Sequence, residues 1–224
     1  MARCQIGLMT MPDLEEAKNL HERVTKGLSR EIYIPTSDED MERLLGYEGI
    51  ALGVWFQERL ICMRAVATDK EWIRHIMESM DLAPDPDNRT AYTKHCIVDK
   101  DFRGNNVQFL TQYAIENQIS DNFDTILTTV SPKNIFSIQN ILACNFVVVA
   151  LKMINGEYMR YIMRKNFRSD LSIWTNGHLV IPSSDFERQR EVLAEGYVGY
   201  KRIRKHRGFS ILYAPMSKEP PRGY

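Results

Sequence analysis

The sequence predicts a fold of mixed helices and strands, α/β (α+β), in which a mixed central sheet carries helices on both faces. Three observations predict this class. The early strand segments are joined in hairpins, and the middle ones alternate with helical segments. A sheet with both kinds of connection needs helices to cover its two faces. The chain has 224 residues, which is enough to bury a substantial core.

The first part of the chain places two helices between a strand and a hairpin. The first helix starts at Pro12, because proline suits a first helical turn, and it ends near Gly27. The second follows Ser37, a capping residue with acidic neighbours, and runs through Leu45. The strand before these helices and the hairpin after them are apolar runs at residues 4–9, 50–56 and 60–67.

The middle of the chain alternates helices and strands up to a closing hairpin. The turn Asn155-Gly156 is typical of a tight hairpin connection. A loop rich in proline and aspartate at 83–88 can act as a lid. The predicted helices lie at 72–80, 106–119 and 132–144, and the predicted strands at 91–98, 124–130, 146–153 and 158–164.

The pattern changes after Arg164. We predict a main domain over residues 1–165, a small α+β extension packed on it over 166–216, and a disordered tail over 217–224, which is rich in proline and charge. The predicted strands of the extension include 172–174 and 178–181, and a helix follows through Ala194. The basic stretch 201–207 is predicted to be the solvated tip of a hairpin.

Composition excludes several classes of function. The formal net charge is zero, which argues against a nucleic-acid or membrane-surface partner. The chain shows neither an apolar run of membrane-spanning length nor a signal peptide at its N-terminus. Its four cysteines are widely spaced, without a metal-binding pattern, so we expect reduced thiols in a cytoplasmic protein and no metal.

The most informative stretch of the chain runs from His95 to Gln108. It reads as a short apolar strand, a turn, and an Arg103-Gly104 step that opens a helix. A helix start leaves backbone N–H groups without partners and carries partial positive charge. Gly104 lets a ligand approach the backbone closely, and phosphate is the usual ligand at such a place.

This stretch resembles a known family. Val98-Asp99-x-x-Phe102-Arg103-Gly104-Asn105-Asn106-Val107-Gln108 is similar to the acyl-CoA signature of GCN5-related N-acetyltransferases (GNAT), in which a strand leads into Arg/Gln-x-x-Gly-x-Gly/Ala at a helix start. The segments 130–137 and 144–146 resemble the later block of that family, and 156–162 resembles its closing hairpin. The element order matches over residues 4–165.

The resemblance implies that acetyl-CoA is the acyl donor. Amides from Arg103 to Gln108 would hold its pyrophosphate, and the acyl-pantetheine arm would pair with the strand backbone. Arg103 can add charge or brace the turn, and Asn134 can touch the cofactor or only cap its helix. The implied cofactor-binding residues are Cys96, Ile97, Val98, Arg103, Gly104, Asn105, Asn106, Val107, Gln108, Asn134 and Ser137.

Some positions depart from the family pattern. Asn106 and Gln108 replace small residues; asparagine tolerates left-handed backbone, whereas glutamine is bulkier. Ile141 stands where many members have a tyrosine that protonates the departing thiolate, and Asn145 replaces a glycine. Another group or solvent protonates the thiolate here, or catalysis has been lost.

His95 and Tyr92 are the candidate catalytic residues, because they lie on the strand expected to face the acceptor. Strand alternation puts them on opposite faces unless a bulge intervenes. His95 has the better intrinsic pKa for a general base, although a packed histidine is the alternative.

The resulting hypothesis is transfer of an acetyl group from acetyl-CoA to a primary amine of a small molecule or peptide. One alternative is an acyltransferase for longer chains, and another is a non-catalytic CoA-binding or regulatory domain. The closing hairpin and the extension also offer edges at which two copies of the chain can pair as a homodimer.

Overall fold

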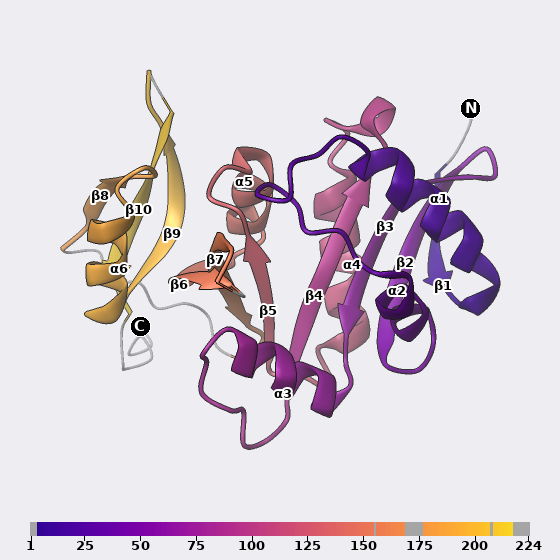
Figure 1. The fold of residues 1–224 in the computed structure, drawn as a ribbon, viewed down its shortest axis with the longest axis horizontal. Helices are drawn as coiled ribbons and strands as arrows, with labels where there is room; N and C mark the ends of the chain where they lie inside the picture. The colour runs from indigo at the N-terminus through magenta and orange to yellow at the C-terminus, as the bar shows by residue number, and fades with distance from the viewer. Residues whose placement is uncertain (1–3, 155, 169–176, 207, 217–224) are drawn as a thin grey trace, which may run out of the picture. The chain divides into compact units, whose positions relative to one another are not determined.

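The computed structural model describes residues 4–154, 156–168, 177–206 and 208–216 (Figure 1). Ten β-strands and six α-helices occur in these ranges. The chain divides into two compact units, Met1–Asp124 and Thr125–Tyr224, which are described in turn. This division differs from the boundary at 165 that the sequence suggests, which remains a prediction.

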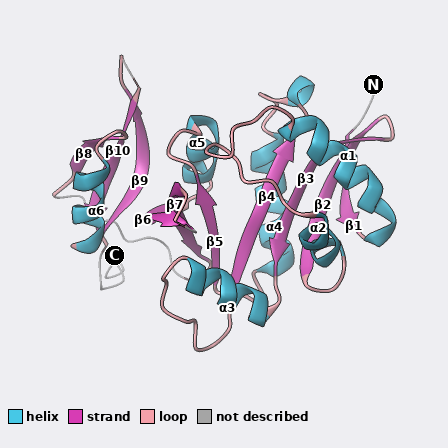
Figure 2. Cartoon of the chain, viewed as in Figure 1, coloured by secondary structure: helices cyan, strands magenta, loops and turns pink. Residues whose placement is uncertain are grey.

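The first unit contains a four-stranded antiparallel sheet in the order β1-β2-β3-β4. In Figures 1 and 2, α1 and α2 lie in front of this sheet and α4 lies behind it, so helices cover both faces as predicted. The elements are β1 (Cys4–Met9), α1 (Leu14–Thr25), α2 (Asp38–Leu45), β2 (Gly49–Phe56), β3 (Arg59–Ala67), α3 (Lys70–Ser79), β4 (Thr90–Val98) and α4 (Val107–Ile119).

Two short 3-10 turns account for small differences from the predicted bounds. Met11–Asp13 forms one around Pro12, so α1 begins two residues later than predicted, at Leu14. Lys100–Phe102 forms the other, between β4 and α4. The core of the unit includes fully buried side chains from α1, α2, β3 and α4, namely Leu20, Leu44, Ile61, Met63 and Ile115.

The second unit contains strands in the order β5-β7-β6-β9-β10-β8. Val148 of β6 pairs with Gly199 of β9, so the C-terminal segment continues the sheet of this unit. On the buried side of α6, Gln189 Oε1 accepts hydrogen bonds from the hydroxyls of Tyr161 and Tyr213, each at 2.7 Å. The elements are β5 (Thr125–Val130), α5 (Ile135–Ala143), β6 (Val147–Ile154), β7 (Tyr158–Asn166), β8 (Leu179–Pro182), α6 (Phe186–Ala194), β9 (Tyr197–Arg204) and β10 (Phe209–Pro215).

The C-terminal predictions have mixed outcomes. A strand does form near 178–181, as β8, whereas the predicted strand at 172–174 and the tail at 217–224 lie outside the described residues. The basic stretch is not confined to a hairpin tip, because Lys201, Arg202 and Arg204 belong to β9 itself. Arg202 also donates a hydrogen bond to Gln139 at 2.6 Å.

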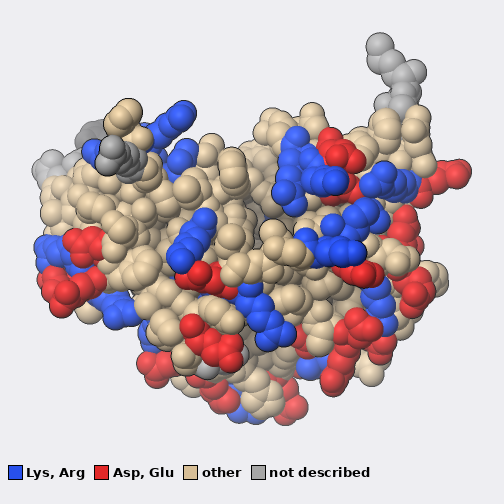
Figure 3. Space-filling model, turned by 45° about the horizontal axis from the view of Figure 1, so that its top comes forward, with Lys and Arg blue, Asp and Glu red and all other residues tan. Residues whose placement is uncertain are grey.

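Acidic and basic side chains are mixed on the face of the molecule drawn in Figure 3. This mixture agrees with the formal net charge of zero. Among the described helices, none has the length and apolar character needed to cross a membrane.

Candidate functional site

A β-bulge in β4 brings the two candidate catalytic residues to one face of the sheet. Ala65 of β3 lies opposite His95, but Ala67 lies opposite Tyr92, so Lys94 is an extra residue on β4. Directly opposed residues share a face, and Ala65 and Ala67 share one because they are two positions apart. The register therefore places Tyr92 and His95 on the same face, whereas plain alternation would separate them.

The imidazole of His95 is buried and has one free nitrogen. The residue is 4% exposed, and its Nδ1 lies 2.9 Å from the hydroxyl of Thr36 in the loop between α1 and α2. Its Nε2 is buried without a hydrogen-bond partner among the described residues. A buried polar atom without a partner is costly, and such atoms commonly mark a place where a ligand or water binds.

Burial lowers the pKa of His95 to about 3, and the positive charges of His21, Lys94 and Arg64 act in the same direction. His95 is therefore neutral at physiological pH. A neutral imidazole keeps one nitrogen lone pair, so this residue can accept a hydrogen bond or a proton.

The N-terminus of α4 presents free backbone amides, as the sequence predicts. Gly104 and Asn106 both adopt left-handed backbone, with φ of 82° and 57°. The N–H groups of Gly104, Asn105, Asn106, Val107 and Phe109 find no acceptor within the described residues, whereas the Leu110 N–H donates to the Asn106 carbonyl at 3.0 Å. A Cβ built on Gly104 would meet nothing within 4 Å, so the space beside it is open. These free amides, called the phosphate cradle below, form a site that fits a phosphate group.

Two polar side chains brace the turn that leads into the cradle. Arg103 Nε donates to the Val98 carbonyl at 3.3 Å, and the Asn105 side-chain amide donates to the Phe102 carbonyl at 3.1 Å. Of the two roles left open for Arg103, the structure shows bracing. A contribution of its charge to cofactor binding stays a prediction.

Asp99 anchors the end of β4 at the same turn. Its carboxylate is 2% exposed and accepts from Arg23 Nε at 2.9 Å and from Arg59 at 2.5 Å. Burial alone would raise the pKa of Asp99, but hydrogen bonds from the Asp101 amide and from Arg23 and Arg59 outweigh it and lower the pKa below its ordinary value. Asp99 thus fixes where the phosphate cradle starts.

We expect Asp99→Asn to lower the free energy of unfolding by about 2 kcal/mol at pH 7, because two arginines lose a buried charged partner. The folded pKa of Asp99 is depressed, so its contribution is present above the unfolded pKa of about 3.9 and is lost as the pH falls below it. Chemical denaturation at pH 7 and pH 3 measures this difference. Asp101→Asn, at an exposed neighbouring position, is the matched control. Equal stability of both variants at pH 7 would contradict the account.

A buried arginine of β3 is hydrogen-bonded to the first turns of α4. Arg64 of β3 is 3% exposed and donates to the Gln108 carbonyl at 2.9 Å, to Thr111 Oγ1 at 3.2 Å and to Gln112 Oε1 at 2.5 Å. The buried face of α4 therefore carries polar Thr111 and Gln112 beside apolar Ile115, whereas Phe109, Leu110 and Tyr113 are exposed.

Cys96, Ile97 and Val98 lie on β4, which is the last strand of this unit's sheet. They pair with β3 on one side. A hydrogen bond from the Cys62 thiol lowers the pKa of the Cys96 thiol, and so do Arg64 and the Thr111 hydroxyl, against the effect of burial. Pairing of the pantetheine arm with this strand stays a prediction.

The predicted site residues of the second unit have a structural role. Asn134 Oδ1 accepts from the Ser137 amide at 3.1 Å, so Asn134 caps α5. Ile141 lies within α5. Contacts of Asn134 and Ser137 with a cofactor remain predictions.

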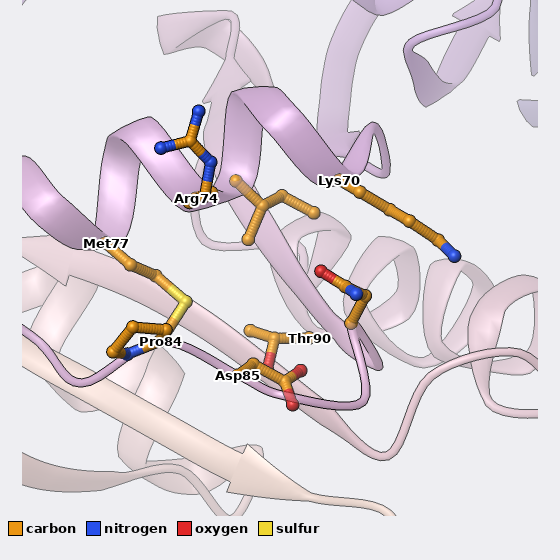
Figure 4. A pocket seen from close by; sticks show the side chains of 8 residues that line it. Lys70, Arg74, Met77, Pro84, Asp85 and Thr90 are labelled. Atoms are coloured by element: carbon orange, nitrogen blue, oxygen red, sulfur yellow. The ribbon is translucent and has the colours of Figure 1, made fainter.

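A small pocket lies between α3 and the predicted lid loop (Figure 4). Met77 and Pro84 lie together at one end of it, and Asp85 and Thr90 line its floor. Its volume is about 50 Å³, room for one or two water molecules. Trp72, Met77 and Met80 are buried. The role of the loop as a lid stays a prediction.

Sequence reasoning missed His21, Tyr33, Thr36 and Arg64. Tyr33 and Thr36 approach His95 because the α1–α2 loop packs against β4, and the Thr36–His95 contact spans 59 residues. His21 lies on α1. Arg64 stands within an apolar run whose pattern indicates only a strand. A charged residue inside such a run is the one signal that could have drawn attention to it.

Comparisons with known proteins agree with this geometry. No family model and no curated protein matches the chain. Solved structures do match. An N-acetyltransferase from Staphylococcus aureus Mu50 has a TM-score of 0.56 and 18% identity, covering 74% of this chain and 99% of its own.

Two further structures give the same result. The ribosomal-protein-S18-alanine N-acetyltransferase from Escherichia coli has a TM-score of 0.55 and 13% identity, covering 78% of this chain and 99% of its own. NAA60 from Arabidopsis thaliana, in complex with acetyl-CoA, has a TM-score of 0.55 and 15% identity, covering 73% of this chain and 98% of its own. The chain therefore has the fold of GCN5-related N-acetyltransferases.

Proposed function

We propose that this protein transfers an acetyl group from acetyl-CoA to a primary amine. One observation carries the proposal. The buried, unpartnered Nε2 of His95 lies on a bulged strand that runs directly into the free amides of α4. One short segment thus combines an acceptor for a proton with a cradle for a phosphate. The similar fold of NAA60, which was solved with acetyl-CoA, supports the choice of donor.

In this proposal, the amides from Gly104 to Val107 and of Phe109 hold the pyrophosphate, and the backbone of Cys96 to Val98 pairs with the pantetheine arm. The Arg103 amide, which the sequence also suggested, instead donates to the Lys100 carbonyl at 3.4 Å. The Gln108 carbonyl accepts a hydrogen bond from Arg64, which holds the first turn of α4 in place. Asn106 supplies the left-handed backbone for which many members use a glycine. Its replacement of a small residue therefore does not close the cradle.

His95 would accept a hydrogen bond from the attacking amine at Nε2 and take its proton as the new C–N bond forms. Because the pKa of His95 is about 3, it cannot remove a proton from an ammonium ion, so the amine must arrive neutral. The C–S bond then breaks, and the CoA sulfur leaves as a thiolate. Since alkyl thiols have pKa values of about 8.5, water suffices to protonate it, and Ile141 in place of a tyrosine is tolerated.

The proposal is tested by the release of the CoA thiol from acetyl-CoA, with and without a panel of amines, amino acids and short peptides. We expect release to depend on an amine and to rise with pH as the ammonium form of the acceptor disappears. Faster release from longer acyl-CoA chains would favour the first alternative, an acyltransferase for longer chains. Binding of acetyl-CoA without release under any condition would favour the second, a non-catalytic CoA-binding domain.

We further propose that the protein works in the cytoplasm, where its thiols, all free in the described residues, stay reduced. Its partners would be acetyl-CoA and an amine-bearing small molecule or peptide. Pairing of two copies remains part of the hypothesis.

A further inference from the structure

The proposed function requires His95 to accept a proton at Nε2, yet the site resists a charged imidazole. His95 is buried, and the positive groups acting on it are His21 of α1, Lys94 of its own strand and Arg64 of β3. A neutral imidazole can take a proton at one nitrogen without becoming charged only if it releases the proton at the other. The partner of Nδ1 therefore decides whether His95 can act.

A line of polar side chains begins at that nitrogen. His95 Nδ1 lies 2.9 Å from Thr36 Oγ1. Burial raises the pKa of Tyr33, and the Thr36 hydroxyl, acting as a hydrogen-bond donor toward Tyr33, opposes this rise. Tyr33 Oη lies 3.2 Å from Nε2 of His21, which is half-buried on α1.

The direction of these hydrogen bonds follows from one backbone amide. The Thr36 N–H donates to His21 Nε2 at 3.2 Å, so that nitrogen carries a lone pair. The Tyr33 hydroxyl must then donate to His21, because its oxygen would otherwise face that lone pair. Tyr33 has no second proton, so Thr36 donates to Tyr33 and accepts from His95 Nδ1–H. This leaves His95 Nε2 with the lone pair that the proposed function needs.

We infer that Thr36, Tyr33 and His21 form a proton relay that carries the proton from His95 toward solvent. This inference rests on the proposed function. As the amine proton reaches His95 Nε2, the Nδ1 proton passes to Thr36, the Thr36 proton to Tyr33, and the Tyr33 proton to His21 Nε2. His21 holds the charge and then releases a proton to water. One proton enters the line and one leaves it, and nothing is oxidised.

His21 is suited to the terminal position. It is more exposed than His95, and Asp38 at the start of α2 acts on it to favour its charged form. Burial nonetheless lowers the pKa of His21 below the ordinary histidine value. At neutral pH its Nε2 is therefore free to accept. Thr36, Tyr33 and His21 are positioning residues, because they act through His95.

The relay predicts a specific result for Thr36→Val, which keeps the side-chain shape and removes the hydroxyl. We expect kcat to fall about tenfold or more, since general acid–base contributions are of this order or larger, with an unchanged KM for acetyl-CoA. Thr36→Ser, which keeps a hydroxyl, should restore most of the rate. Tyr33→Phe should lower kcat in the same way. In wild-type protein, kcat should also fall at acid pH, below the ordinary histidine pKa of about 6.5, because His21 becomes protonated and can no longer accept the proton. Thr36→Val should abolish this pH dependence.

A second measurement is independent of activity. Nitrogen-15 NMR of the imidazole should show His95 protonated at Nδ1 in the wild type and lose this preference in Thr36→Val. An active wild-type enzyme whose kcat is unchanged by Thr36→Val would overturn the relay and leave the function standing, and so would a His95 protonated at Nε2. The absence of amine-dependent turnover in the wild type would overturn the function, and the relay with it, whatever tautomer is found.

Discussion

Replacing His95 by alanine is expected to lower kcat for acetyl transfer by about 10²- to 10⁴-fold, the range of a lost general base. The loss arises because the variant lacks the lone pair of His95 Nε2, which receives the proton of the attacking amine in the proposed reaction. Binding of acetyl-CoA should be unchanged, since the cradle lies at the start of α4. Steady-state kinetics combined with direct binding measurements separate the two effects.

His75→Ala is the matched control for this variant, because His75 is exposed on α3 and takes no part in the site. Thermal unfolding of both variants should show that each remains folded. A His95→Ala enzyme with wild-type kcat across the pH range would exclude His95 from catalysis and leave it as a packed histidine.

Placing a carboxylate in the phosphate cradle should have the second-largest effect. We expect Gly104→Glu to weaken acetyl-CoA binding by about 10- to 100-fold, because a negative side chain would stand beside the pyrophosphate. Isothermal titration calorimetry measures this change directly.

Gly196→Glu provides a control matched in backbone strain. Gly196 has φ of 89° against 82° for Gly104, and a Cβ at either position meets nothing within 4 Å. Both variants should therefore lose similar stability, about 1–2 kcal/mol for a left-handed non-glycine residue. If both bind acetyl-CoA equally well, the cradle is not the phosphate site.

The elements of the fold could be predicted because they depend on local patterns. Apolar runs locate β2 and β3, the capping residue Ser37 marks the start of α2, and the turn at Gly104 marks the start of α4. The boundary of the extension is harder to predict, because β9 continues the sheet through the Val148–Gly199 pair, and strand pairing between distant segments leaves no local signal.

The site was predictable only in part, for the same reason. The cradle is one continuous segment, so its residues Gly104, Asn106 and Val107 can be identified from the sequence. The bulge at Lys94 depends on the register of two strands, so the sequence of β4 alone does not predict it. His21 on α1, and Tyr33 and Thr36 in the loop that follows, come near His95 only through tertiary packing, and Arg64 lies inside a strand whose neighbours are apolar.

The central claim is that the segment from Cys96 to Val107 holds acetyl-CoA. The most direct test is a titration of wild-type protein with acetyl-CoA, followed by the backbone amide NMR signals. We expect saturable shifts concentrated at Gly104, Asn106 and Val107, with smaller ones at Cys96 to Val98. Saturable shifts confined to other parts of the chain, or none at millimolar acetyl-CoA, would contradict it.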